Sequence, residues 1–213
     1  FNNETALISG KNMSHCTNFK FQYTDKKLII QTFCNLELKC EDGIVCSYDS
    51  EYDKALGISS EERPAIVAES NGFKYFMEDF GNHYELSIEK HNITSADERI
   101  AKQMGKEFQK QYVKCAAQQV MKQMERNGHS CLLEENSDGF EIKFGLMYEK
   151  SLFIKLQNGR VIERVRGVKG KSCQSITEAL ENMLSSADVE LNTEWTDEYY
   201  ENSDDGLKIY DLG

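Results

Sequence analysis

The sequence predicts an α+β fold, in which an antiparallel sheet packs against one long central helix and a C-terminal strand–strand–helix unit follows. Three observations predict it. A helical pattern runs from Ser95 to Gly128, short strand patterns joined by turn residues lie on both sides of it, and a shorter helical pattern follows the last strands. The chain has 213 residues, of which 39% are hydrophobic, and this is enough to bury a core.

The long helix has recognisable ends. Ser95 and Glu98 are spaced as a capping box, and Gly128 suits the left-handed position that ends a helix. Its apolar residues recur at every fourth position, so the stripe drifts around a helix of 3.6 residues per turn. We expect the helix to wrap across a sheet or to bend near Gly105. We interpret the following stripe as core: Ile100, Met104, Phe108, Tyr112, Ala116, Val120 and Met124.

Before the long helix, a strand is expected at residues 18–24, and then a helix that Asp25 caps. Residues 39–53 contain Asp42-Gly43 and predict a short hairpin. The acidic residues 51–63 predict a loop that ends at Pro64. The helix after Asp25 has an apolar face made of Leu28, Ile29, Phe33, Cys34 and Leu36. Three further strands are expected at 65–69, 73–78 and 84–89.

After the long helix, four strands in succession predict an antiparallel meander, with Asn158-Gly159 as its clearest hairpin turn. Ser175 and Glu178 are spaced as the capping box of a shorter helix. The four strands are expected at residues 130–133, 140–147, 151–157 and 160–167. The inward face of the shorter helix is expected to contain Ile176, Ala179, Leu180, Met183 and Leu184.

We expect four parts in the chain. Met13 is a candidate natural start, so residues 1–12 are interpreted as a leader or expression remnant. An α+β domain is expected at 13–149, a small ββα domain at 150–201 and a tail at 202–213. The boundary at 149/150 is soft, because the strands on its two sides can belong to one sheet.

Charge and cysteine content narrow the classes of partner and compartment. The formal net charge is -11, and a field of that sign repels nucleic acid and anionic lipid, although a local basic patch remains compatible with it. No apolar run approaches the ~20 residues of a membrane span. Seven cysteines, an odd number at irregular spacing, indicate a reducing compartment, and no signal peptide is visible. We therefore expect a cytoplasmic protein that binds neither nucleic acid nor membrane.

Few residues are arranged for chemistry. Cys16, Cys40 and Cys46 are candidate zinc ligands, but their spacing is looser than that of structural zinc sites, so we predict no metal and no cofactor. Cys173 is the best candidate nucleophile, because it lies near a helix start beside Lys169 and Lys171. The same stretch is not a phosphate-binding loop, which needs four residues rather than two between its glycines.

The C-terminal region is acidic and aromatic. Between Asp188 and Asp205 there are eight acidic residues and no basic residue, with three aromatic side chains among them. Aromatic anchors among carboxylates suit docking into a basic groove of a partner, and the alternative is a tail that folds back on its own sheet. The candidate partner-binding residues are Lys169, Lys171, Cys173, Trp195, Thr196, Glu198, Tyr199 and Tyr200.

Two stretches resemble families without an established activity. Over residues 13–145 the chain resembles the hypothetical chloroplast reading frame thirty-five family of plastids, cyanobacteria and other bacteria. That likeness lies in Met13-Ser14-His15, the hairpin at 72–89, the helix around Gln111-Tyr112 that leads to NGHS, and the Asp138-Gly139 hairpin. Over residues 151–201 it resembles a small bacterial domain of unknown function. The motifs there are a Gly-x-Lys-Gly-x-Ser-Cys turn, a helix and a Thr-x-Glu-Tyr-Tyr sequence.

Neither resemblance supplies a catalytic residue. What it implies is a companion of an ATPase of the AAA class, because such proteins tend to be encoded beside these ATPases. We therefore expect a non-enzymatic binding or adaptor protein that has a protein partner. The alternative is a thiol-dependent enzyme or redox protein that uses Cys173.

Overall fold

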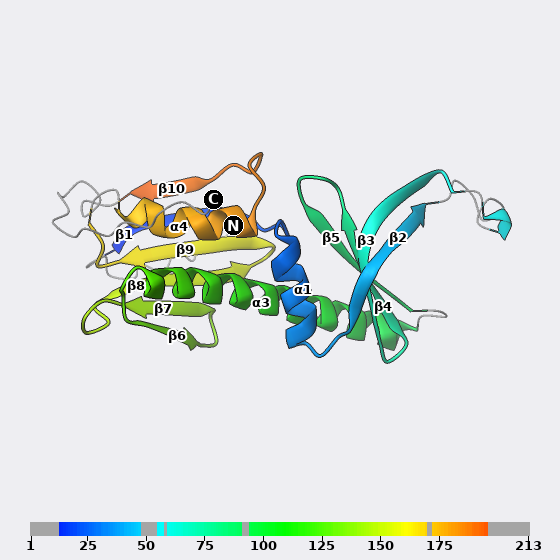
Figure 1. Cartoon of the computed structure of the whole chain (residues 1–213), viewed down its shortest axis with the longest axis horizontal. Helices are drawn as coiled ribbons and strands as arrows, with labels where there is room; N and C mark the ends of the chain where they lie inside the picture. Colours follow the sequence, from blue (N-terminus) through cyan, green and yellow to red (C-terminus); the bar gives the residue numbers. More distant parts are fainter. Residues whose placement is uncertain (1–12, 48–54, 58, 91–93, 170–171, 196–213) are drawn as a thin grey trace, which may run out of the picture. The chain divides into compact units, whose positions relative to one another are not determined.

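The computed structural model describes residues 13–47, 55–57, 59–90, 94–169 and 172–195 (Figure 1). The predicted α+β class is confirmed. The chain forms two compact units, and each is described by itself. The first unit is built from the described residues of Phe1–Phe21, Ala117–Glu181 and Val189–Gly213, and the second from those of Gln22–Ala116 and Asn182–Asp188.

The first unit contains a six-stranded antiparallel sheet with the order β10-β1-β9-β8-β7-β6. The predicted meander is confirmed as β6 to β9, and β7 and β8, on the two sides of position 149/150, are neighbours in the sheet. Asn158 and Gly159 both have positive φ, as a two-residue hairpin turn requires. The strands are β1 (Met13–Lys20), β6 (Cys131–Glu135), β7 (Phe140–Phe144), β8 (Lys150–Gln157), β9 (Arg160–Arg166) and β10 (Asn192–Trp195).

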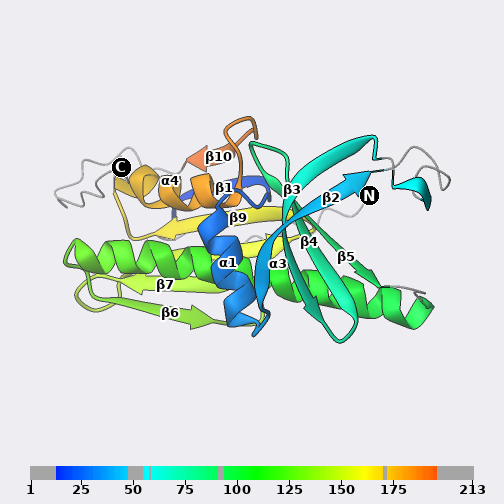
Figure 2. The same cartoon turned by 45° about the vertical axis from the view of Figure 1, so that its right-hand side comes forward.

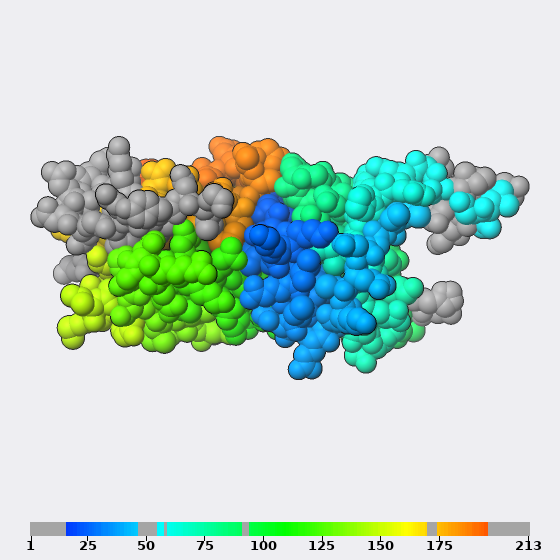
Figure 3. Space-filling view, viewed as in Figure 1, coloured from blue at the N-terminus to red at the C-terminus, as the bar shows by residue number. Residues whose placement is uncertain are grey.

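One face of this sheet forms the core of the first unit. Figures 1 and 2 show α4 (Ser172–Leu184) and the C-terminal part of α3 (Ser95–Arg126) on the same side of the strands. In the space-filling view, side chains of α3, in green, cover much of this side (Figure 3). The buried strand residues alternate with exposed or half-buried ones, as a sheet covered on one face requires, except in β8, where Ser151 is buried beside Leu152. They include Thr17, Phe19, Phe140, Ile142, Phe144, Leu152, Ile154, Val161, Glu163 and Val165.

Glu163 is an exception among these core residues, because it carries an ionisable carboxyl group. It is fully buried, and neither of its carboxyl oxygens has a hydrogen-bond partner. Burial, and secondly the neighbouring Glu181 of α4, raise the pKa of the Glu163 carboxyl well above its usual value. Burial penalises the charged carboxylate, so the folded protein favours the neutral form of this group.

The second unit contains a four-stranded antiparallel sheet with the order β2-β3-β4-β5. Its strands are β2 (Cys40–Ser47), β3 (Glu61–Ser70), β4 (Phe73–Asp79) and β5 (Tyr84–Lys90). Helix α1 (Lys26–Asn35) and the N-terminal part of α3 complete the unit. Asp25 caps α1 as predicted, since its carboxylate accepts hydrogen bonds from the N–H groups of Lys27 and Leu28.

Tyr112 is the polar centre of the second unit. Its buried hydroxyl accepts hydrogen bonds from the N–H groups of Thr24 and Asp25, each at 3.1 Å, and donates one to the carbonyl of Met183 at 2.9 Å. Its ring meets that of Tyr23 edge to face. Burial raises the pKa of Tyr112 to about 12, so the hydroxyl keeps its proton.

The expected end of α3 at Gly128 is confirmed, since Gly128 has a φ of 89°. The predicted capping box at its start is wrong by one residue. Thr94 is the cap, because its N–H donates to Asp97 at 2.9 Å and its hydroxyl accepts from the N–H of Asp97 at 3.2 Å. Lys90 stabilises this arrangement, since its ammonium group lies 2.7 Å from Asp97. Lys90, and then Thr94, lower the pKa of Asp97 to about 2.

We expected α3 to wrap across one sheet or to bend near Gly105. In the structure, α3 contributes to both units. A row spaced by four residues rotates by about 40° per turn of helix, so its members cannot all face one core. Five members of the row are buried, whereas Ile100 near the start is 48% exposed. In α1, Cys34 is likewise exposed rather than part of the apolar face.

The hairpin expected at Asp42-Gly43 is wrong, because β2 runs through both residues. Gly43 is needed there for close packing, since a Cβ atom on it would lie 2.6 Å from Val67. The predicted loop also ends too late, because β3 begins at Glu61 and contains Pro64. Proline fits at this point because β3 pairs with β4 only from Ala65 onward.

Two other predicted boundaries are wrong. The first strand, expected at 18–24, is β1 at Met13–Lys20. Ser175 does not cap α4, which begins at Ser172. Serine is tolerated in the first turn of a helix as well as at its cap, so the Ser-x-x-Glu spacing alone did not fix the start.

Candidate functional site

An exposed apolar turn joins β7 to β8 at the left end of the first unit in Figure 1. Leu146 is 98% exposed and Met147 is 87% exposed, and Tyr148 beside them is also exposed. Three consecutive apolar or aromatic residues at the tip of a turn are unusual, because turns are normally polar. We call residues 145–149 the apolar turn.

The backbone of the apolar turn is held in a defined conformation. The Glu149 carboxylate accepts a hydrogen bond from the N–H of Met147 at 2.9 Å. This bond, and then the N–H of Glu149 itself, lower the pKa of the Glu149 carboxyl. Gly145 has a φ of 101°, and the carboxylate occupies the place where a side chain on Gly145 would lie, 2.5 Å from an ideal Cβ. A larger residue does not fit there without moving Glu149.

The apolar turn contacts the loop that follows β9. Gly167 has a φ of 70°, and a Cβ atom on it would lie 2.7 Å from the carbonyl oxygen of Glu149. The two backbones approach so closely only because Gly167 lacks a side chain. The start of the Gly-x-Lys-Gly-x-Ser-Cys segment is therefore fixed against the base of the apolar turn.

The described residues that were predicted to bind a partner lie at this same end of the sheet. Phe144 pairs with Lys150 on the two sides of the apolar turn, and Arg166 is the last residue of β9. Lys169, which is exposed, lies three residues after Arg166 in the connection to α4. Cys173 lies in the first turn of that helix.

Trp195, the last residue of β10, pairs with His15 in β1 at this end of the sheet and is 36% exposed. The other sequence-predicted residues lie outside the described part of the chain. They are Lys171, Thr196, Glu198, Tyr199 and Tyr200.

The apolar turn itself was missed from the sequence, because residues 140–147 were assigned to one strand. In the structure, β7 ends at Phe144. Gly145 and Glu149 carried a usable signal, since a glycine followed four residues later by a carboxylate suits a turn closed by side-chain hydrogen bonds to the backbone.

Among the described residues, no group of three or more His, Cys, Asp and Glu side chains is placed to hold a metal ion. Cys16 lies on β1 of the first unit, whereas Cys40 and Cys46 lie on β2 of the second unit. Within the described part of the chain, no helix has the length and apolar character needed to cross a membrane.

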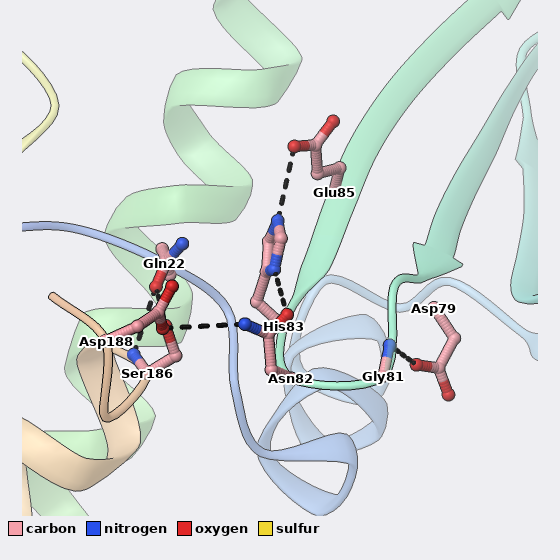
Figure 4. Close-up of polar contacts among 8 residues, drawn as sticks. All are labelled: Gln22, Asp79, Gly81, Asn82, His83, Glu85, Ser186 and Asp188. Atoms are coloured by element: carbon pink, nitrogen blue, oxygen red, sulfur yellow. Dashed lines mark hydrogen bonds and ion pairs between the residues drawn. The ribbon is translucent and has the colours of Figure 1, made fainter.

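The second unit contains a cluster of polar side chains that includes a serine and a histidine (Figure 4). The Ser186 hydroxyl bonds to the side-chain oxygen of Gln22 and to the Asp188 carboxylate. Asp188 also accepts a bond from the Asn82 amide at 3.5 Å. These contacts join the turn between β4 and β5 to the segment after α4.

His83 in this cluster has different partners. One ring nitrogen lies 2.7 Å from the Asn82 side-chain oxygen and the other 3.3 Å from Glu85 (Figure 4). Nucleophilic catalysis by Ser186 requires its hydroxyl to bond to a base such as an imidazole. Because both groups bond elsewhere, we interpret the cluster as a structural clamp on the β4–β5 turn.

Comparison with known proteins found a family match in the C-terminal part of the chain. No curated protein and no solved structure matched the chain. Residues 153–200 match the model of a family described as "Protein of unknown function (DUF2997)". The matched residues include most of β8, all of β9, α4 and β10. This part of the chain is therefore similar to a family of unknown function, as was expected for residues 151–201.

Proposed function

We propose that this chain is a non-enzymatic binding protein that recognises a protein partner through the apolar turn. The observation that carries the proposal is the near-complete exposure of Leu146 and Met147 on a turn with a fixed backbone. Exposed apolar residues grouped together are typical of interaction sites. A turn that is already ordered loses little conformational entropy when it binds, which favours affinity.

The size of the effect can be stated in advance. Burying the side chain of Leu146 or Met147 in a partner stabilises a complex by about 1.5–3 kcal/mol each. Replacing either one by serine therefore weakens binding at least about tenfold. Both side chains are too exposed to stabilise the fold, so the same substitutions leave the free energy of unfolding unchanged within about 0.5 kcal/mol.

Residues near the apolar turn extend the proposed site. Lys169 and Trp195 lie at the same end of the sheet, and tryptophan is a frequent anchor in interfaces. Cys173 lies in the neighbouring first turn of α4. We assign the rim of the site to these three residues. We also include in the proposed binding residues, on the sequence argument alone, those that lie outside the described part of the chain: Lys171, Thr196, Glu198, Tyr199 and Tyr200.

Affinity capture from native lysate tests this function. Wild-type protein is compared with Leu146→Ser/Met147→Ser and with the control Ile44→Ser/Leu56→Ser, which changes two exposed apolar residues of the second unit. A partner that is retained by wild type and control but lost with the turn variant supports the proposal. Identical partner sets for all three proteins would contradict it, provided that thermal unfolding shows all three to be folded.

The sequence resemblances suggest the class of the partner and a relationship for the N-terminal part of the chain. We propose that the partner is an ATPase of the AAA class and that the first two thirds of the chain are related to the chloroplast reading frame thirty-five family. Mass spectrometry of the captured partner tests the first point. The absence of any AAA-class ATPase from the proteins that depend on Leu146 and Met147 would count against it.

A thiol-dependent activity at Cys173 is the second candidate. The observation that favours it is the position of Cys173 in the first turn of a 13-residue helix, since helix N-termini stabilise thiolates. It predicts that a thiol reagent at neutral pH alkylates Cys173 before the exposed Cys34. Slower alkylation of Cys173 than of Cys34 in the folded protein would remove this candidate.

A further inference from the structure

The face of the six-stranded sheet opposite its core is strongly basic at its centre. On β9, Val161, Glu163 and Val165 are buried in the core, so the alternate residues Arg160, Ile162, Arg164 and Arg166 belong to the other face. The same alternation places Phe153 and Lys155 of β8 and Lys20 of β1 on that face. We call Lys20, Lys155, Arg160, Arg164 and Arg166 the basic face.

The strand register brings these side chains together. Arg164 pairs with Phe153, Ile162 with Lys155, and Arg160 with Lys20. Paired residues lie about 5 Å apart across the strands, and Arg164 and Arg166 lie about 7 Å apart along β9. The Arg160 guanidinium donates a hydrogen bond to the Asn18 side chain of β1 at 2.7 Å, which confirms that both residues share this face.

Acidic residues near this face lie on β6, β7 and β10 and in the β6–β7 turn, where the Asp138 carboxylate is 3.8 Å from the ammonium group of Lys155. Glu134 is on β6, Glu141 on β7 and Glu194 on β10. Glu134 forms an ion pair with Lys143 at 2.7 Å. The central strands β1, β9 and β8 therefore present positive charge together with Phe153 and Ile162, both half-buried.

The chain separates its charges along the sequence. From Lys150 to Lys169 there are six basic residues, and the one acidic residue, Glu163, points into the core. The 18 residues after Trp195 contain six acidic residues, one lysine and three tyrosines. The acidic segment therefore has the charge that complements the basic face, in a protein whose overall charge of -11 disfavours external polyanions.

The acidic segment also starts within reach of this face. It begins after Trp195, at the end of β10, and β10 is separated from β9 only by β1. The distance from β10 to β9 is about 10 Å, whereas 18 residues can span up to about 60 Å. A tethered segment acts at an effective concentration of about 1 mM, so weak electrostatic attraction is sufficient.

We propose that the acidic segment Thr196–Gly213 binds the basic face of its own sheet. Arginine guanidinium groups bind carboxylates in bidentate geometry and stack on tyrosine rings, so both kinds of residue in the segment have partners. This contact competes with any external acidic ligand and with docking of Tyr199 and Tyr200 in a partner. The inference depends on the basic face, not on the apolar turn, and goes beyond the proposed function.

Photo-crosslinking of the purified full chain tests the inference. Tyr200 is replaced by p-benzoylphenylalanine, and crosslinked peptides are identified by mass spectrometry at low protein concentration and 50 mM NaCl. We expect intramolecular crosslinks to β8 or β9, with a yield that falls at least threefold at 500 mM NaCl because salt screens the charges. Because no lysate partner is present, this result is independent of the proposed function.

Charge reversal supplies the matched control. Arg160→Glu/Arg166→Glu changes two exposed residues of the basic face, and Lys102→Glu/Lys106→Glu makes the same change in charge on exposed residues of α3. We expect at least a threefold loss of the crosslink in the first variant and no loss in the second. Intramolecular crosslinks confined to other strands, crosslinks between copies, or equal yields in both variants would overturn the inference. Hydrogen exchange of 196–205 in the wild-type chain gives a second readout, and exchange that does not accelerate with salt would also overturn it.

Discussion

Replacing Glu163 by glutamine changes a buried carboxyl group that destabilises the core of the first unit. The carboxyl of Glu163 is fully buried, and its two oxygens lack hydrogen-bond partners. Burial, followed by the Glu181 carboxyl on α4, raises its pKa well above the usual value. The proton is therefore bound more tightly in the folded protein than in the unfolded chain.

The sign and size of the effect follow from this difference. In the unfolded chain a glutamate has a pKa of about 4.3, so below that pH both states are protonated and the pH-dependent cost of burying Glu163 is absent. Above it only the folded state holds the proton, and stability falls by about 1.4 kcal/mol per pH unit until the folded pKa is reached. Each pH unit over which the folded state keeps this proton adds to the cost, and two to three such units correspond to about 3–4 kcal/mol.

Glutamine has nearly the same shape and no charge at any of these pH values. Its buried amide lacks partners, as the neutral carboxyl does, but it leaves two N–H donors unsatisfied where the carboxyl leaves one O–H. The one additional unsatisfied donor costs about 1–3 kcal/mol, so part of the gain is cancelled. We expect Glu163→Gln to be more stable than wild type by about 1–2 kcal/mol at pH 7.5 and to be equal to it or less stable at pH 4.5.

Urea unfolding at both pH values measures this difference. Glu141→Gln, on β7 and facing away from the core, is the control for loss of a carboxylate from the same sheet. Wild type and the control are expected to lose stability from pH 4.5 to 7.5 relative to Glu163→Gln. Equal pH dependence in all three proteins, or a destabilised Glu163→Gln at pH 7.5, would refute the reasoning.

Three further substitutions test hydrogen bonds and backbone contacts within the two units. Tyr112→Phe removes the acceptor of two backbone N–H groups at the start of α1 and should lower the free energy of unfolding by about 1–3 kcal/mol in urea, whereas the exposed Tyr148→Phe should not change it. Asp97→Asn weakens the α3 cap and should speed hydrogen exchange in its first turn at pH 7. In wild type, exchange in the first turn should become faster only below about pH 3. The Asp97 carboxyl has a folded pKa of about 2 and an unfolded pKa of about 3.9, so its stabilisation of the cap is complete above about 3.9 and is lost as the pH falls through about 2. Gly145→Ala must displace the Glu149 carboxylate and should cost about 1–2 kcal/mol more than Gly81→Ala, which has open space at a similar φ.

The sequence was sufficient for elements that depend on local signals. The Asn158-Gly159 turn requires two residues with positive φ, so the hairpin of β8 and β9 was predicted from two letters. Asp25 and Gly128 marked helix ends because capping depends on neighbouring backbone groups. The fold class followed from these signals and from the alternation of the strands.

Features that depend on distant contacts were not predictable. Asp42-Gly43 resembles a hairpin turn, but Gly43 lies inside β2 because Val67 of β3 occupies the space beside it. The drift of the α3 stripe was interpreted as a helix that wraps one sheet or bends near Gly105, whereas the helix contributes to two units. The residue pattern of a single sequence does not indicate that the two parts of one helix pack in different units.

The candidate site was predicted only in part for the same reason. The sequence identified Lys169, Cys173 and Trp195 separately, but only the strand register shows that they lie at one end of a sheet. The apolar turn was hidden, because Leu146 and Met147 look like the continuation of a strand. Their exposure follows from the end of β7 at Phe144, which is set by pairing with β8.

Photo-crosslinking from the apolar turn tests the central claim most directly. Met147 is replaced by a photoreactive methionine analogue or p-benzoylphenylalanine in the full chain, which is then irradiated in native lysate; the same probe at the exposed Ile44 is the control. We predict one dominant crosslinked protein from position 147 that is missing from position 44 and is lost when Leu146→Ser is added. The same crosslinked proteins from both positions would contradict the assignment of the apolar turn as the binding site.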